Sequence, residues 1–395
     1  MMTDCEKKTL KLHLLFSFFN GSSMGVTWSL YEVVARKALG ASAFQITLLV
    51  MGLPFAWLLS SVFTNAMQTQ KSYRPFLIGA GMVRMAAMSG MFWVHSPWQY
   101  LALMVAYLVP LGVINPAQNF VLARNYPDEH RGAWFGIATS VTNGMSLITA
   151  ILGGALLDVN QQWFRPIFFA VGTLGAVASF ILASIPVPRR ETLERWENPV
   201  KKIFHIFKKD KKFWIFERNF FIYGCGFLIL SPVIPLFMVD ALGMTYKEIS
   251  FARGVLGVLG VIVFSPFTGR FMDKHNPFVY AGKIFALLAL FPVMLFVGGF
   301  AGKSAVYGAY ILYSLAMAGI TIVWNIGSIF FAQKDSEATY QSIHITMTGV
   351  RGLIAPLFGF MAMHFFGYYT AFVLSFVLFI TASTMMMHAA KTNAD

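Results

Sequence analysis

Apolar runs of about 20 residues recur along the whole chain, and they limit its fold more than any other feature. In helical form a run of this length crosses a hydrocarbon core of ~30 Å. The chain of 395 residues is 57% hydrophobic and only 12% charged, beyond what soluble domains carry. The runs predict an all-α membrane protein with twelve transmembrane helices, near residues 12–36, 42–67, 74–95, 97–123, 132–157, 163–186, 213–239, 246–271, 277–299, 304–332, 340–365 and 367–390.

The net charge of +13 is distributed unevenly between the loops. If the N-terminus is cytoplasmic, the outer loops carry only Arg36, Lys37, Arg165, Lys247 and Lys303, and the other loop and tail cations lie inside. This positive-inside bias predicts that the N- and C-termini are cytoplasmic. The protein is expected in the plasma membrane, which in a bacterium is the inner membrane. The basic charge is therefore attributed to topology, and no nucleic-acid partner is expected.

One long polar break, at residues 187–212, separates six expected helices from six. It holds nine basic and four acidic residues, and Val200, Ile203, Phe204 and Phe207 follow the spacing of an amphipathic helix. We expect a basic helix on the inner leaflet, with a flexible charged linker as the alternative. The domains expected are an N-terminal six-helix bundle (1–186), this cytoplasmic linker (187–212) and a C-terminal six-helix bundle (213–395).

The two halves also show traces of a common pattern. The stretch "KALGASAFQIT" (37–47) aligns with "DALGMTYKEIS" (240–250) at an offset of 203. The same offset places Gln70-Lys71 on Asp273-Lys274. These matches in register indicate a duplication and two pseudo-symmetric bundles.

A six-plus-six helical pattern with a central cytoplasmic linker resembles the major facilitator superfamily (MFS) of secondary transporters. The stretch "GRFMDKHNP" (269–277) is similar to that family's loop signature G-x-x-x-D-[RK]-x-G-[RK], which Gly269, Asp273 and Lys274 match. Arg131, before Gly132, also fits the family's Arg-Gly after the fourth helix. The resemblance implies the MFS fold and a cytoplasmic gate formed by Gly269, Asp273, Lys274 and Arg131.

The sequence departs from the family pattern in two places, the loop signature of the first half and the fifth helix. In the first half Ala66 and Gln70 replace the signature's Gly and Asp, so a charged latch is expected only in the second half. The fifth helix, "GMSLITAILGG" (144–154), lacks the proline that the antiporter branch often carries there. The missing proline argues against a drug–proton antiporter, which stays as an alternative.

Ionisable residues inside spanning helices are candidates for function, because each is costly there. Arg351 and Arg84 lie deepest, whereas Glu32 and Arg253 are near enough to the outer helix ends to reach the interface. Arg351 shares a helix sector with His344 and Thr348, which predicts that it faces water or substrate. A structural arginine that bonds carbonyls or a carboxylate is the alternative, and for Arg84 a structural brace is favoured.

The resemblance further implies a central cavity lined by the first and fourth helices of each half. Polar stripes occur on those helices and on Arg351's helix. The expected substrate-binding residues are Arg351, Asn20, Tyr31, Gln118, Asn119, Trp324, Asn325, His344 and Thr348. Glu32 is the expected ion-coupling residue, either taking up a proton or pairing with an arginine.

These features together predict a secondary active transporter that works by alternating access. The expected substrate is a small anionic or amphipathic organic solute held by Arg351, with protons as the candidate coupling ion. A drug or metabolite–proton antiporter is one alternative, and a lipid flippase or membrane sensor is another. Because the sequence shows no catalytic or metal-ligand grouping, we expect neither enzyme activity nor a cofactor or metal. We also expect the protein to be a monomer.

Overall fold

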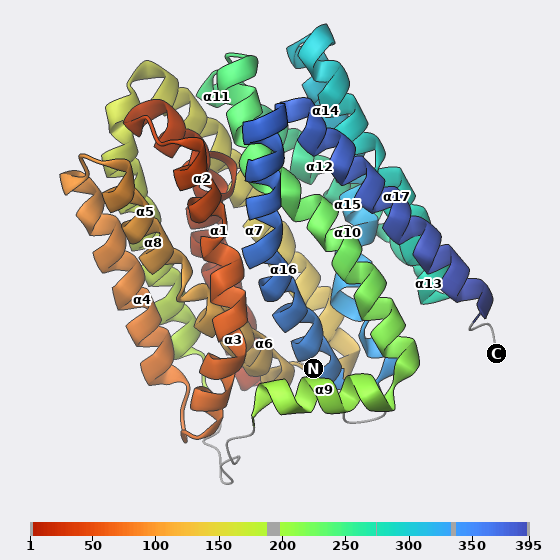
Figure 1. Cartoon of the computed structure of the whole chain (residues 1–395). Coiled ribbons are helices and arrows are strands. Elements are labelled where there is room, and N and C mark those ends of the chain that lie inside the picture. Colours follow the sequence, from red (N-terminus) through yellow and green to blue (C-terminus); the bar gives the residue numbers. More distant parts are fainter. Residues whose placement is uncertain (1–2, 188–197, 274, 333–336, 393–395) are drawn as a thin grey trace. The chain divides into compact units, whose positions relative to one another are not determined.

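The computed structural model describes residues 3–187, 198–273, 275–332 and 337–392, and helices make up almost all of them (Figure 1). The first half contains α1 (Asp4–Leu39), α2 (Ala43–Val50), α3 (Gly52–Gln68), α4 (Arg74–Ser89), α5 (Pro97–Leu108), α6 (Leu111–Asn125), α7 (Asp128–Val159) and α8 (Phe164–Ser184). The second half contains α9 (Pro199–Lys209), α10 (Lys211–Leu236), α11 (Tyr246–Ser250), α12 (Gly257–Asp273), α13 (Pro277–Leu288), α14 (Leu290–Ala301), α15 (Lys303–Ile326), α16 (Glu337–Phe366) and α17 (Tyr368–Thr392). The expected all-α class is confirmed.

Local sequence explains where the helices begin and break. Thr3 and Ser42 cap α1 and α2 through capping boxes, and Gly40, at a φ of 67°, ends α1 in a left-handed conformation. Pro110 lies in the short break between α5 and α6, because proline lacks the backbone N–H that a continuous helix needs. Several expected spans are therefore built from two helical pieces.

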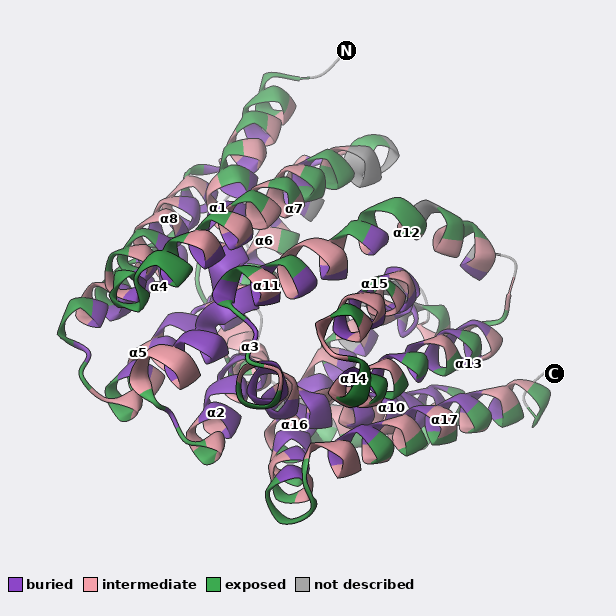
Figure 2. Cartoon of the chain, turned by 90° about the horizontal axis from the view of Figure 1, so that it is seen from above, coloured by how far each residue is buried: buried purple, intermediate pink, exposed green. Residues whose placement is uncertain are grey.

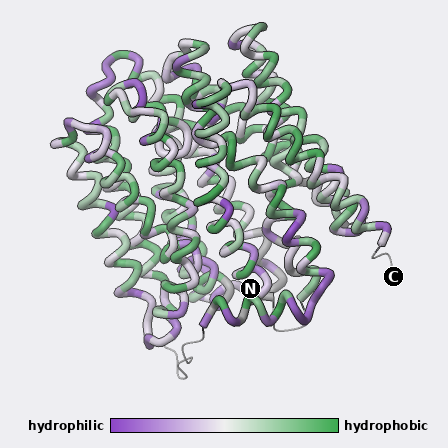
Figure 3. The backbone as a smooth tube through the Cα atoms, viewed as in Figure 1, coloured by the Kyte–Doolittle hydropathy of each residue, from purple (hydrophilic) through white to green (hydrophobic). Residues whose placement is uncertain are grey.

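Eleven segments of the described chain are long and apolar enough to cross a membrane. The first expected span is not among them, although α1 has 36 residues and is about 54 Å long at 1.5 Å per residue. Its middle, "NGSSMGVTWS" (20–29), is rich in small and polar residues. Hydrophilic residues gather mainly near helix ends and in the connections (Figure 3).

The chain divides into two compact units, each described here by itself. The first comprises residues 1–197 together with Thr245–Gly254, and the second comprises Asn198–Met244 and the chain from Val255 onward. In Figure 2 buried and exposed residues alternate along helices such as α7 and α17, as amphipathic packing requires.

In the first unit α1 packs against α7 and α8, and α4 packs along α8. Two glycines bring α1 and α7 into close contact. A Cβ at Gly21 would stand 2.3 Å from the Thr142 carbonyl oxygen, and one at Gly25 would stand 2.1 Å from that of Ser146. Only glycine allows this approach of the two backbones.

In the second unit α10 packs between α16 and α17, and α13 packs against α17. Tyr223 of α10 stacks on Phe285 of α13, with ring centroids 4.2 Å apart. Helix α9 runs across the end of α10 (Figure 1). The expected apolar stripe of α9 divides, because Ile203 and Phe207 pack on the second unit whereas Val200 and Phe204 are exposed.

We predict that Gly25→Ala destabilises the first unit by about 1–3 kcal/mol, because the added methyl overpacks the contact between α1 and α7. Thermal unfolding of the purified protein in detergent measures this loss. Gly144→Ala, on α7, is the matched control, because a Cβ there has nothing within 4 Å. Equal losses in the two variants would contradict the close packing at Gly25.

Candidate functional site

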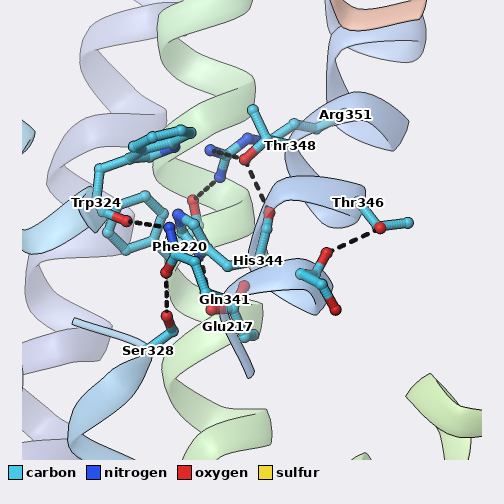
Figure 4. Close-up of polar contacts among 10 residues, drawn as sticks. Glu217, Phe220, Trp324, Ser328, Gln341, His344, Thr346, Thr348 and Arg351 are labelled. Atoms are coloured by element: carbon cyan, nitrogen blue, oxygen red, sulfur yellow. Dashed lines mark hydrogen bonds and ion pairs between the residues drawn. The ribbon is translucent and has the colours of Figure 1, made fainter. Parts of the chain in front are cut away.

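A polar cluster lies where α10, α15 and α16 of the second unit meet (Figure 4). Four of the expected substrate-binding residues belong to it: Trp324 on α15, and His344, Thr348 and Arg351 on α16. The spacing from 344 to 348 to 351 is i, i+4, i+7, so these three side chains share one face of α16. The sequence-based grouping of the α16 residues therefore corresponds to a real neighbourhood.

Arg351 is held by the protein itself. Its Nη1 donates to the Phe220 carbonyl oxygen at 2.7 Å, and its Nη2 donates to Thr348 Oγ1 at 2.9 Å. Thr348 in turn donates to the His344 carbonyl oxygen at 2.9 Å. The guanidinium is 5.4 Å from the centroid of the Phe220 ring, so the charge also meets an aromatic face.

A glycine on α10 makes room for this guanidinium. A Cβ at Gly224 would lie 2.2 Å from Arg351 Cζ, so any larger residue would displace the side chain. The absent side chain opens a notch in α10 at the height of Arg351. Thus Arg351 joins α16 to α10 through a backbone carbonyl and a close fit.

The same cluster contains a buried acid that the sequence analysis missed. His344 Nδ1 and Glu217 Oε1 are 2.8 Å apart, and each side chain is only 1% exposed. Glu217 lies on α10 and His344 on α16, so this contact is a second polar link between the two helices. Glu217 is therefore a second buried acid in addition to Glu32, the acid that the sequence analysis singled out.

Glu217 was missed because it lies four residues after the expected helix start and next to Lys211, Lys212 and Arg218. A carboxylate near several basic residues at a helix start is typical of a membrane interface, where water solvates it. The available signal was the apolar, aromatic stretch "FWIFERNFF" (213–221), which contains Glu217 and indicates burial.

Three buried nitrogens near this cluster lack a hydrogen-bond partner: His344 Nε2, Arg351 Nε and Asn219 Nδ2. Buried polar atoms are nearly always bonded, so such exceptions indicate a function or an absent partner. The imidazole of His344 is met edge-on by the rings of Phe220 and Trp324, at centroid distances of 4.7 and 5.7 Å. Its free nitrogen therefore lies in an aromatic setting.

The second expected α15 residue is placed differently. Asn325 is exposed, and its Nδ2 donates to the Thr321 carbonyl oxygen at 2.7 Å. Ser328 and Gln341 complete the cluster: Ser328 donates to the Gln341 side chain, whose Nε2 donates to the Trp324 carbonyl oxygen at 3.3 Å. These contacts join α15 to α16 below the imidazole.

In the first unit Arg84 occupies a similar setting. It donates to the Gly175 carbonyl oxygen at 3.1 Å, to Ser23 Oγ at 3.3 Å and to Tyr107 Oη at 2.7 Å. A Cβ at Gly175 would lie 2.6 Å from its Cζ, so here too a glycine notch receives a guanidinium. Arg84 thereby connects α4 to α1, α5 and α8.

Glu32 of α1 is paired with Arg253, which belongs to the same unit. Two parallel hydrogen bonds of 3.0 Å join the guanidinium to the carboxylate, and Arg253 also donates to the Ser29 carbonyl oxygen. The Glu32 side chain is 3% exposed and that of Arg253 is 18% exposed. The two hydrogen bonds from Arg253 supply the partner that a buried carboxylate needs.

Arg253 is in turn fixed by the contacts of its own segment. Asp158, near the end of α7, accepts hydrogen bonds from the backbone N–H groups of Tyr246 and Lys247 at 2.8 and 2.9 Å. These N–H groups open α11 and would otherwise be unsatisfied. Glu32 therefore has the pairing role, and its role in ion coupling stays a prediction.

Among the remaining expected residues of the first unit, Tyr31 lies beside Glu32 and forms a side-chain hydrogen bond with it. Asn20 Nδ2 donates to the Met24 sulfur at 3.2 Å, and the Tyr31 carbonyl oxygen accepts from Tyr100 Oη at 2.9 Å. On α6, Gln118 is half-buried and Asn119 is exposed. Their part in substrate binding stays a prediction.

The expected cytoplasmic gate is only partly visible. Gly269 lies within α12, which ends at Asp273. The side chains of Asp273 and Arg131, and all of Lys274, lie outside the described part of the chain. A latch there remains a prediction. Within the described ranges no three His, Cys, Asp or Glu side chains gather as metal ligands.

The chain is similar to known proteins along its whole length. The sequence model described as "Major Facilitator Superfamily" matches residues 14–356. The multidrug resistance protein MdtG of Dickeya zeae is 22% identical over 97% of this chain and 93% of its own length. The proton-coupled antiporter flippase LtaA of Staphylococcus saprophyticus is 22% identical over 42% of each chain, and an MFS-type efflux pump of Mycolicibacterium smegmatis is 25% identical over 46% of this chain and 42% of its own.

Solved structures resemble the fold closely at low sequence identity. The nucleoside transporter NupG matches with a TM-score of 0.72 and 14% identity over 98% of this chain and 100% of that one. A D-xylose-proton symporter matches with a TM-score of 0.69 and 12% identity over 96% of both chains. At these identities the likeness shows the fold alone.

We predict that Glu32→Gln lowers the free energy of unfolding by about 3–5 kcal/mol, because the charge of Arg253 then loses its carboxylate. Chemical or thermal unfolding in detergent measures the loss. The double variant Glu32→Gln with Arg253→Gln should lose less than the single one, because no buried charge is left unpaired. A double variant whose loss equals the sum of the two single losses would contradict this account.

Proposed function

Because the chain belongs to the Major Facilitator Superfamily of secondary transporters, we propose that it exports amphipathic organic solutes in exchange for protons. The proton-binding site of this proposal is the pair of Glu217 and His344. The solute moves by alternating access across the plasma membrane, with both termini in the cytoplasm. The uneven distribution of basic loop residues supports that orientation.

The observation that carries the proposal is the free Nε2 of His344 in a buried pair. When Glu217 is ionised, it accepts a hydrogen bond from His344 Nδ1, which leaves Nε2 as the nitrogen that gains or loses a proton. With the proton, carboxylate and imidazolium form a neutral pair. Without it, a buried negative charge remains, with the Arg351 guanidinium two turns further along α16.

This change of charge alters the contact between α10 and α16. A neutral ion pair holds the two helices together, whereas an unpaired carboxylate favours access of water or a cation. A transporter couples proton and solute when the two bind differently in its two conformations. In this proposal the pair supplies that difference, because its charge acts on the contact between α10 and α16.

The substrate class is supported by the relatives and by the chain's composition. A multidrug resistance protein matches nearly the whole chain, and an efflux pump and a proton-coupled antiporter flippase match parts of it. Aromatic residues make up 16% of the chain. The rings of Phe220 and Trp324 contact the His344 imidazole, and the ring of Tyr223 packs on Phe220. Such walls suit a solute with a large apolar part.

A second candidate function is supported by Arg351. Its Nε is buried without a partner, so the guanidinium retains a donor for an anionic group on the solute. On this reading the protein transports small organic anions, and Arg351 recognises them. The bonds of Arg351 to Phe220 and Thr348 favour the first candidate, because they already fix both of its Nη atoms.

We predict that Glu217→Gln and His344→Gln abolish proton-driven transport, because the first removes the carboxylate that stabilises the imidazolium and the second removes the imidazole itself. Efflux of ethidium from proteoliposomes, driven by a pH gradient, should fall to the level of protein-free vesicles. Ethidium exchange without a gradient should persist. Glu248→Gln is the matched control, because glutamine also completes the capping box at Thr245. Unchanged gradient-driven efflux in both variants would refute the proton site.

The second candidate is tested with an amphipathic anion, anilinonaphthalene sulfonate. If Arg351 recognises the anion, Arg351→Lys should reduce its transport about tenfold, the effect of a lost charge-assisted hydrogen bond. Ethidium transport should fall much less. If both probes lose transport equally, Arg351 has a structural role and the anion reading is wrong.

A further inference from the structure

A groove lies between the first turns of α1 and the middle of α7, within the first unit. Its volume is about 550 Å³, which is in the range of ligand sites. The walls are apolar, and they are formed by Leu10, Leu14, Leu15, Phe18 and Val141. Lys7 and Lys11 line the end nearest the start of α1.

The groove follows from the spacing of α1. Positions 7, 11, 14 and 18 recur at i, i+4, i+7 and i+11, so they share one face of the helix. Phe18 on this face and the neighbouring Leu15 are 42% and 41% exposed, so the helices of the first unit leave this apolar surface uncovered. Lys8 points about 100° away from Lys7 and does not line the groove.

The dimensions of this face correspond to one leaflet of a bilayer. Lys7 and Phe18 are eleven positions apart, or about 16 Å along the helix at 1.5 Å per residue. Half of a hydrocarbon core is ~15 Å thick. Two ammonium groups therefore lie at headgroup depth when the apolar part of the groove lies beside the acyl chains.

The positive charge of Lys7 and Lys11, at the end of the groove called its mouth here, determines which lipid headgroup can bind. Asp4 is 3.9 Å from Lys7, but its side chain is fully exposed, so water screens this pair. The Glu6 carboxylate accepts from the backbone N–H of Thr3. Lys11 has no acidic neighbour among the residues that line the groove. The mouth is thus complementary to a phosphate.

We propose that this groove binds an anionic phospholipid of the adjacent leaflet, with the phosphate at Lys7 and Lys11 and an acyl chain along Leu14 and Phe18. The site is separate from the proton-binding pair and does not depend on the proposed transport activity. Each lysine at headgroup depth contributes about fivefold to the affinity for an anionic lipid.

Native mass spectrometry of the full chain in detergent tests the site, with dioleoyl phosphatidylglycerol and dioleoyl phosphatidylcholine as probes. We expect the double variant Lys7→Gln with Lys11→Gln to bind phosphatidylglycerol roughly 25-fold more weakly. Its affinity for phosphatidylcholine should not change. Lys8→Gln is the matched control and should change neither affinity by more than about twofold.

Two further variants test the apolar part while both lysines remain. Leu14→Trp fills the groove from α1, and Val141→Phe fills it from α7, so a folding defect in one leaves the other informative. Both should weaken phosphatidylglycerol binding, and glycerol phosphate, which has no acyl chain, should not bind at the lipid concentrations used. The proposal is overturned if Lys8→Gln matches the double variant, if neither filling variant weakens binding, or if glycerol phosphate binds as tightly as the lipid.

Discussion

The cost of placing charge inside hydrocarbon governs this structure. An ionised side chain there must find a partner within the protein, and four charged positions find it in different ways. Arg84 and Arg351 use carbonyl oxygens, hydroxyl groups and a glycine notch on a neighbouring helix. Glu32 uses the paired donors of Arg253. In each case the polar contact joins helices that are distant in sequence, so burying the charge also fixes the packing.

The pair of Glu217 and His344 differs from these in one respect. An arginine side chain has a very high pKa, whereas an imidazole changes its charge near physiological pH. A buried contact that can be charged or neutral holds two helices together in one state and loosens them in the other. This property is what a proton-coupled transporter requires. It links the packing of α10 and α16 directly to the proposed function.

The sequence alone predicts the secondary structure well, because each apolar run must be a helix. The run expected at 340–365 is α16, Glu337–Phe366, and the run expected at 367–390 is α17, Tyr368–Thr392. The face shared by His344, Thr348 and Arg351 also follows from helical spacing. Partners are harder to predict, since Glu217 is 127 positions from His344 and Arg253 is 221 from Glu32. Periodicity within a helix gives no information about which helix lies opposite.

The central claim is that the buried pair of Glu217 and His344 exchanges a proton. Infrared difference spectroscopy of the purified protein, recorded between about pH 5 and pH 8, tests it most directly. The account predicts pH-dependent imidazole bands in the wild-type protein that are absent from His344→Gln, and an accompanying carboxylate band that is absent from Glu217→Gln. Identical difference spectra in the wild type and both variants would contradict it.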